Sequence, residues 1–101
     1  MGAQFFVHLL NLAVSPSTVS KPAAFNIAAD LNESPLQDMA VPLRVSIGGG
    51  PEFLWIYSHL LIQSGDNDGS LTIDSQVFPT GQVTWTGSLG GSTASAVVTI
   101  T

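Results

Sequence analysis

Hydrophobic and polar residues alternate with a period of two along most of the chain, which is typical of β-strands with one buried face. The alternation is clearest over 23–31 and 94–100, where Phe25, Ile27 and Val98 take the apolar positions. No window carries an apolar period of 3.6 residues bounded by capping residues, so we expect no helix longer than about two turns. Turn signals recur every ~8–15 residues, and the pattern therefore predicts an all-β sandwich of about seven strands.

The strands expected from this pattern cover 5–14, 23–31, 41–47, 53–62, 71–77, 83–86 and 94–100. Pro42 lies inside the third run, which predicts an edge strand or a bulge there. The run 53–62 is apolar on both faces, and its aromatic and β-branched residues favour a strand over a short helix. The expected core consists of Phe25, Ile27, Leu31, Leu43, Val45, Leu71, Ile73, Val83, Trp85, Val98 and Ile100.

Composition and charge narrow the function classes. The chain has 101 residues, which corresponds to one domain, 1–101. Only 9% of the residues are charged, and Lys21 and Arg44 are the only bases against seven acids. No basic patch can be assembled from two bases to neutralise phosphates, so we expect no nucleic-acid partner. No stretch approaches the ~18–20 apolar residues of a membrane span, and the N-terminus lacks the basic start of a signal peptide.

Residues that could carry chemistry are few. The chain has no cysteine, and His8 and His59 are isolated in apolar runs without further zinc ligands. Asp66-Asn67-Asp68-Gly69 has the carboxylate spacing of half a calcium loop, but serines stand where the outer ligands belong, which favours a turn. No nucleophile elbow is present. We therefore expect no catalytic site, no cofactor and no metal, and a protein that is not an enzyme.

The two ends of the chain resemble a known family. The stretches Gly81–Leu89 (GQVTWTGSL) and Ser92–Ile100 (STASAVVTI) resemble the last two strands of the immunoglobulin-like repeats of bacterial and archaeal surface proteins. Leu12–Val19 (LAVSPSTV) resembles their interrupted first strand. The middle departs from the family, because 48–51 (GGGP) replaces its acidic turn. The resemblance implies an immunoglobulin-like sandwich, a fold that also occurs in accessory domains of phage capsids and tails and that hosts many unrelated roles.

Apolar residues beyond the needs of one core predict an interface. Phe5, Phe6, Val7 and Leu9 put bulky groups on both faces of the terminal segment 1–10, which could pair with the sheet edge of a neighbouring chain. Phe53, Trp55 and Tyr57 share one face of the aromatic run 53–62. Ordinary core packing is the alternative for these rings. A carbohydrate platform is a further alternative, and it requires the Trp55 and Tyr57 rings to be coplanar and exposed.

These observations favour a non-enzymatic structural protein, namely a small phage virion protein that decorates or cements a capsid by packing into a multimer or lattice. The expected partner is a protein, either further copies of the chain or the lattice itself, and the expected location is the virion. The alternative is a spacer or adhesive repeat taken from a bacterial cell-surface protein.

Overall fold

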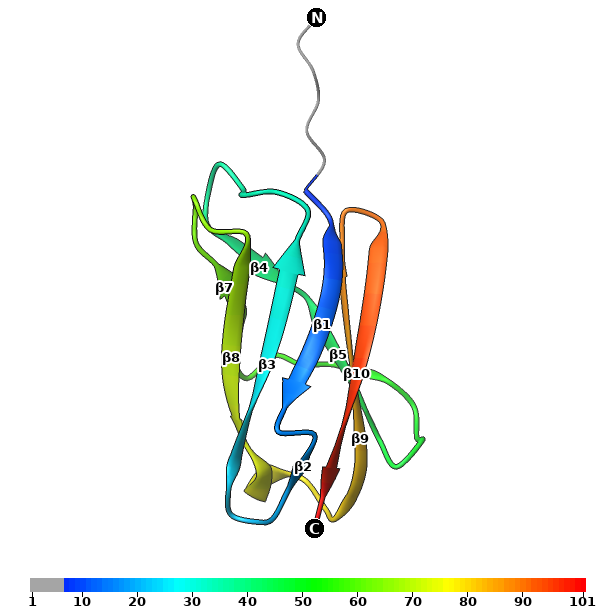
Figure 1. The fold of residues 1–101 in the computed structure, drawn as a ribbon. Helices are drawn as coiled ribbons and strands as arrows, with labels where there is room; N and C mark the ends of the chain where they lie inside the picture. Colours follow the sequence, from blue (N-terminus) through cyan, green and yellow to red (C-terminus); the bar gives the residue numbers. More distant parts are fainter. Residues whose placement is uncertain (1–6) are drawn as a thin grey trace, which may run out of the picture.

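The computed structural model describes residues 7–101, and these residues form a nearly all-β structure (Figure 1). The described residues contain no α-helix, and thus no helix able to cross a membrane; a short 3-10 turn spans Ser75–Val77. The strands are β1 (Leu9–Ser15), β2 (Thr18–Val19), β3 (Ala24–Leu31), β4 (Met39–Val41), β5 (Leu43–Ile47), β6 (Phe53–Leu54), β7 (Leu60–Ile62), β8 (Asp68–Asp74), β9 (Gly81–Leu89) and β10 (Ser92–Ile100).

The strands form three sheets. A three-stranded sheet has the order β1-β3-β8, a five-stranded sheet has the order β2-β10-β9-β5-β6, and β4 pairs with β7. Neighbours are antiparallel except β2 and β10, where Thr18 lies opposite Thr99. In Figure 1, β8, β3 and β1 form the front layer and β9 and β5 lie behind it. This arrangement is compatible with the β-sandwich that the alternation predicts.

The core lies between the layers, with Trp85 of β9 at its centre. Trp85 is fully buried. The centroid of its ring lies 6.2 Å from that of Phe25, 5.7 Å from that of Phe78 and 5.1 Å from that of Trp55. All the core residues expected from the alternation are buried except Leu71, which is half-buried and packs against the others. A period of two is therefore a sound guide to the buried face of β3, β5, β9 and β10.

The aromatic run 53–62 is not one strand, and that expectation is wrong. β6 pairs with β5 of the five-stranded sheet, whereas β7 pairs with β4, so the chain leaves one sheet and enters another between Leu54 and Leu60. Pro42 marks a similar transfer between β4 and β5 and is neither a bulge nor part of an edge strand. Proline has no N–H for a ladder, which suits a position between sheets.

Other boundaries also shift. The two last strands are longer than expected, and they meet at Gly90-Gly91, whose φ angles of 62° and 84° suit a two-residue hairpin turn. β1 begins at Leu9, and its register against β3 shifts between Leu9 and Asn11. Leu9 and Leu12 are therefore both buried although they are three residues apart. Val77 lies in the 3-10 turn, which the Asp74 carboxylate caps by accepting from the Gln76 N–H at 2.9 Å.

Candidate functional site

β6 and the residues that follow it project apolar side chains into solvent. We call residues 53–58 the aromatic loop. Its exposed fractions are 42% for Phe53, 52% for Leu54, 65% for Ile56 and 76% for Tyr57. Exposed apolar residues scattered singly are normal, but a contiguous exposed set marks an interaction site. The aromatic loop is such a set.

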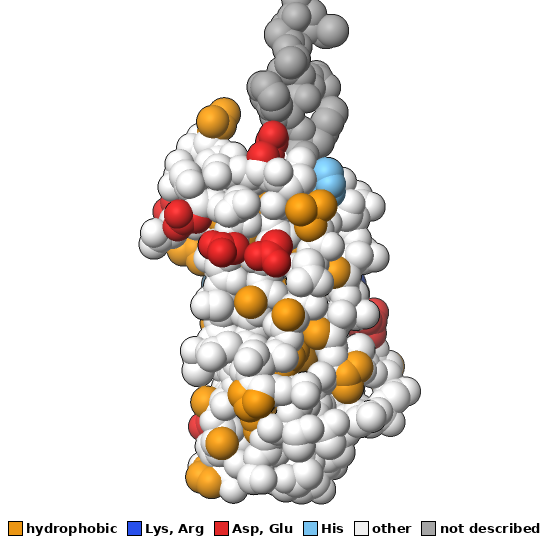
Figure 2. Space-filling model, viewed as in Figure 1, with side chains coloured by type: hydrophobic (Ala, Val, Ile, Leu, Met, Phe, Trp, Pro, Cys, Tyr) orange, Lys and Arg blue, Asp and Glu red, His pale blue; other side chains and the backbone are white. Residues whose placement is uncertain are grey.

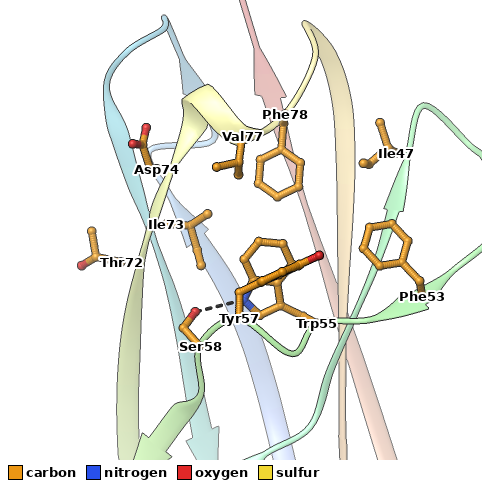
Figure 3. Close-up of a pocket in the computed structure, with 10 residues that line it drawn as sticks. All are labelled: Ile47, Phe53, Trp55, Tyr57, Ser58, Thr72, Ile73, Asp74, Val77 and Phe78. Carbon is orange, nitrogen blue, oxygen red and sulfur yellow. Dashed lines mark hydrogen bonds between the residues drawn. The ribbon is translucent and has the colours of Figure 1, made fainter.

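The aromatic loop borders an open groove of about 450 Å³, which we call the aromatic groove (Figure 3). Figure 3 shows Ile73 of β8 on one side of the groove and Phe53 and Ile47 on the other. Trp55 and Phe78 lie between these walls, with ring centroids 5.6 Å apart and planes inclined at 28°. The remaining lining residues are Tyr57, Ser58, Thr72, Asp74 and Val77. The inner surface is thus mostly apolar.

Trp55 is held firmly in this groove. Its backbone N–H donates to the Leu43 carbonyl at 2.9 Å, and its indole Nε1–H donates to Ser58 Oγ at 3.0 Å. The Tyr57 ring stands on its edge, with centroids 4.9 Å apart and an angle of 69° between the planes. Two rings at this angle cannot both lie flat against a sugar, so the geometry required for a carbohydrate platform is absent from Trp55 and Tyr57.

The groove lies where the sandwich is open. β8 ends the three-stranded sheet, and β6 ends the five-stranded one. β7 packs against the start of β8 so closely that a Cβ on Gly69 would lie 2.6 Å from the Leu61 carbonyl oxygen. On the other side of the sandwich, β1 and β10 lie next to each other (Figure 1). Residues 70–74 of β8 therefore form an open edge directly beside the groove.

The structure separates the interface residues expected from the sequence. It brings Phe53, Trp55 and Tyr57 together at the aromatic groove. Leu9 is 2% exposed because the register shift in β1 turns it into the core, so the expectation that Leu9 meets a partner is wrong. Val7 is partly buried against the same core. Phe5 and Phe6 lie outside the described residues.

The sequence pattern does not predict half of the residues that line the groove. Ile73 comes from β8, Val77 ends the 3-10 turn and Phe78 follows it, all more than a dozen positions after the aromatic loop. Nothing in the local pattern links the two segments. The one local signal is Phe78, an apolar residue between the end of the expected strand 71–77 and Pro79.

Several acidic residues gather toward one end of the β1-β3-β8 face (Figure 2), whereas Asp74 lines the groove. Asp30 and Asp68 lie directly opposite each other on β3 and β8. Within residues 7–101, no three histidine or carboxylate side chains converge as a metal site would require. Elsewhere this face carries mostly small and uncharged side chains.

Comparisons with known proteins identify the fold alone. No protein-family model and no curated protein matches the chain. Among solved structures, it is similar to Pseudomonas fluorescens alkylpurine DNA glycosylase AlkC bound to DNA containing an abasic site analog, with a TM-score of 0.65 and 14% sequence identity. The match covers 99% of this chain and 32% of that one. The chain thus spans about a third of the length of that structure's chain.

That likeness corrects two exclusions drawn from the sequence. The expectations that the chain is not an enzyme and has no nucleic-acid partner are contradicted, because the same fold forms part of a DNA glycosylase solved with DNA. Both rested on charge and on missing motifs within 101 residues. A domain that makes up a third of a longer enzyme need not supply the catalytic groups or the phosphate contacts itself, so its own composition does not decide either question.

Proposed function

We propose that this chain is an immunoglobulin-like structural module that packs against neighbouring protein subunits in a multimer or lattice, such as the decoration layer of a phage capsid. The immunoglobulin-like assignment is supported by the hairpin of β9 and β10, whose residues carry the resemblance to surface repeats. The role is supported above all by one observation, the contiguous exposure of Phe53, Leu54, Ile56 and Tyr57.

The energetics favour a protein partner at the aromatic loop. A specific contact needs ~800 Å² per partner, and burying apolar area contributes ~25 cal/mol per Å². Removing Phe53, Leu54 and Ile56 from water costs little desolvation, since these side chains have no polar groups. Glu52 is the only charged residue adjoining the loop in sequence. Association there is thus driven by apolar burial.

A second candidate is a spacer or adhesive repeat of a bacterial cell-surface protein. Its support is the path of the chain, because β1 begins at one end of the molecule and β10 finishes at the opposite end (Figure 1). Domains of this shape join end to end with little bending of the linker. This candidate predicts a monomer in solution.

Sedimentation velocity separates the two candidates. We expect the wild type to associate at tens of micromolar, which corresponds to a free energy of about −6 to −7 kcal/mol. The double variant Ile56→Ser/Tyr57→Ser should be monomeric over the same range, because both side chains are exposed and their loss leaves the core intact. Leu36→Ser is the matched control, since Leu36 is 94% exposed and lies outside the aromatic loop.

A wild type that remains monomeric at these concentrations refutes packing into a multimer and leaves the repeat or a protein that binds only a preformed capsid shell. Equal association of the wild type and the double variant refutes the aromatic loop as the contact. A fluorescent DNA duplex added in a parallel titration tests the likeness to the glycosylase. Duplex binding without protein association would also overturn the proposal.

A further inference from the structure

The open edge of β8 is a site for an additional strand. β8 pairs with β3 on one side only, from Ala24 opposite Asp74 to Asp30 opposite Asp68. Over residues 70–74 the backbone groups directed away from β3 have no strand beside them in the part of the chain that the structure describes. An edge of this kind accepts an extended peptide through main-chain hydrogen bonds.

The aromatic groove lies next to this edge and supplies the apolar contacts. Ile73 of β8 belongs to the groove wall, and Phe53 closes it from the other sheet (Figure 3). Side chains of a strand alternate between its two faces. A strand added to β8 would therefore direct every second side chain toward the Trp55 and Phe78 rings while its backbone pairs with β8.

We propose that residues 2–6 of a second copy, Gly-Ala-Gln-Phe-Phe, occupy this edge and insert a phenylalanine into the aromatic groove. The segment is as long as the open stretch 70–74. Phe5 and Phe6 are adjacent, so one of them faces the groove whichever way the strand is placed. Aromatic pairs contribute beyond their buried area when ring centroids are ~4.5–7 Å apart, and the groove already offers several rings.

The segment of the same copy is too short for this role. Leu9 lies opposite Leu31, and Thr72 lies opposite Asn26, five residues further along β3. At ~3.3 Å per residue along the strand and ~4.8 Å between strands, reaching Thr72 from the start of β1 takes roughly 19 Å. About six extended residues cover that distance, whereas Phe5 and Phe6 precede Leu9 by only four and three residues, so neither phenylalanine reaches Thr72. The occupant must come from another molecule.

The distribution of charge also favours residues 2–6 as the segment that binds a second copy. Each chain has a net charge of −5, and all seven acids lie between Asp30 and Asp74. Two copies repel each other in general. Residues 2–6 contain no acid, so they can approach Asp74 beside the groove without this penalty. Passing a segment from each copy to the next is a heterologous contact, which builds closed rings or open filaments.

This inference rests on the proposed multimer, and two variants of the full chain test it separately. Phe5→Ser/Phe6→Ser removes both candidate anchors and should abolish association in sedimentation velocity. Leu10→Ser is the matched control, because Leu10 is 59% exposed on β1 yet lies outside the donor segment. We expect the control to associate like the wild type.

A synthetic peptide tests the acceptor groove directly. The blocked peptide Gly-Ala-Gln-Phe-Phe-Val, added to the Phe5→Ser/Phe6→Ser chain, should bind saturably and change the tryptophan fluorescence of the protein, because Trp55 lines the groove. Adding Val77→Asp to that chain should weaken binding at least about tenfold, or ~1.4 kcal/mol, because Val77 lines the groove and is 63% exposed. A peptide with serine at both phenylalanine positions should not bind.

The outcomes separate the inference from the proposed function. A wild type that never associates refutes the multimer. The peptide titration then shows by itself whether the groove binds this strand. Unchanged association of the Phe5→Ser/Phe6→Ser chain overturns the inference and leaves the multimer standing. Association that survives this change but is lost with Val77→Asp indicates pairing of two β8 edges and also overturns it. Peptide binding that ignores Val77→Asp places the peptide elsewhere and overturns it too.

Discussion

Trp85 offers a sharp test of how the core is held together. Its side chain is fully buried and touches the rings of Phe25, Trp55 and Phe78. Its indole Nε1–H has no hydrogen-bond partner among residues 7–101. The residue thus combines a large stabilising contribution from ring packing with a cost from one unsatisfied donor.

Two substitutions separate these contributions. Trp85→Ala removes every ring contact and leaves a cavity, which typically costs ~3–5 kcal/mol. That is a large share of the ~5–15 kcal/mol expected for the whole domain. Trp85→Phe retains a ring and eliminates the buried donor, whose desolvation costs ~1–3 kcal/mol. For Trp85→Phe, the smaller ring lowers the stability and the removal of the donor raises it. We therefore expect its free energy of unfolding to fall by less than ~1.5 kcal/mol.

Urea unfolding, monitored by far-ultraviolet circular dichroism, measures the free energy of unfolding of Trp85→Ala and of Trp85→Phe. The midpoint of thermal unfolding should fall by at least about 12 °C for Trp85→Ala, at ~4 °C per kcal/mol. Val97→Ala is a surface control and should stay within ~0.5 kcal/mol of the wild type, since Val97 is 44% exposed. If Trp85→Phe proves as destabilising as Trp85→Ala, the unsatisfied donor carries no cost and the reasoning fails.

Three further predictions concern Gly69 of β8, the pair Asp30 and Asp68, and metal binding. Gly69→Ala should destabilise the domain by ~1–3 kcal/mol in urea unfolding, because the new Cβ would lie 2.6 Å from the Leu61 carbonyl oxygen; an unchanged midpoint would show that β7 moves freely. Asp30→Asn should stabilise by ~0.2–1 kcal/mol at low salt by removing repulsion from Asp68, and less at high salt; an equal gain at both salt concentrations would contradict a charge effect. Melting with and without chelator should coincide, and a fall of about ten degrees would instead identify calcium or zinc binding.

The sequence predicts the buried faces better than the connections between sheets. Alternation in β3 and β9 follows from a local rule, because one face of each strand meets the core along its whole length. The transfers at Pro42 and Trp55 follow no local rule. Period-two alternation is the same whichever sheet a strand joins, so two short strands of different sheets were read as a single long one.

The candidate site was predictable only in part, for a related reason. The surplus of apolar residues in 53–57 is visible in the sequence, but the wall formed by Ile73 and Phe78 depends on tertiary packing. Leu9 was misassigned because the register shift before Asn11 breaks the period of two. A bulge of this kind moves one side chain to the opposite face, and the residue types around Leu9 do not reveal it.

The edges of the sheets give a physical reason to look for a partner at β8. Isolated proteins protect open edges with lysine, proline, inward charges or a covering segment. β1 and β10 cover one another, and β6 is only two residues long. Residues 70–74 of β8 have neither a basic residue nor a proline, and an apolar groove lies beside them. Such an edge would favour aggregation if it stayed uncovered at high concentration. The edge itself carries one charge, that of Asp74, so the proposed strand from a second copy would cover it and prevent unspecific pairing.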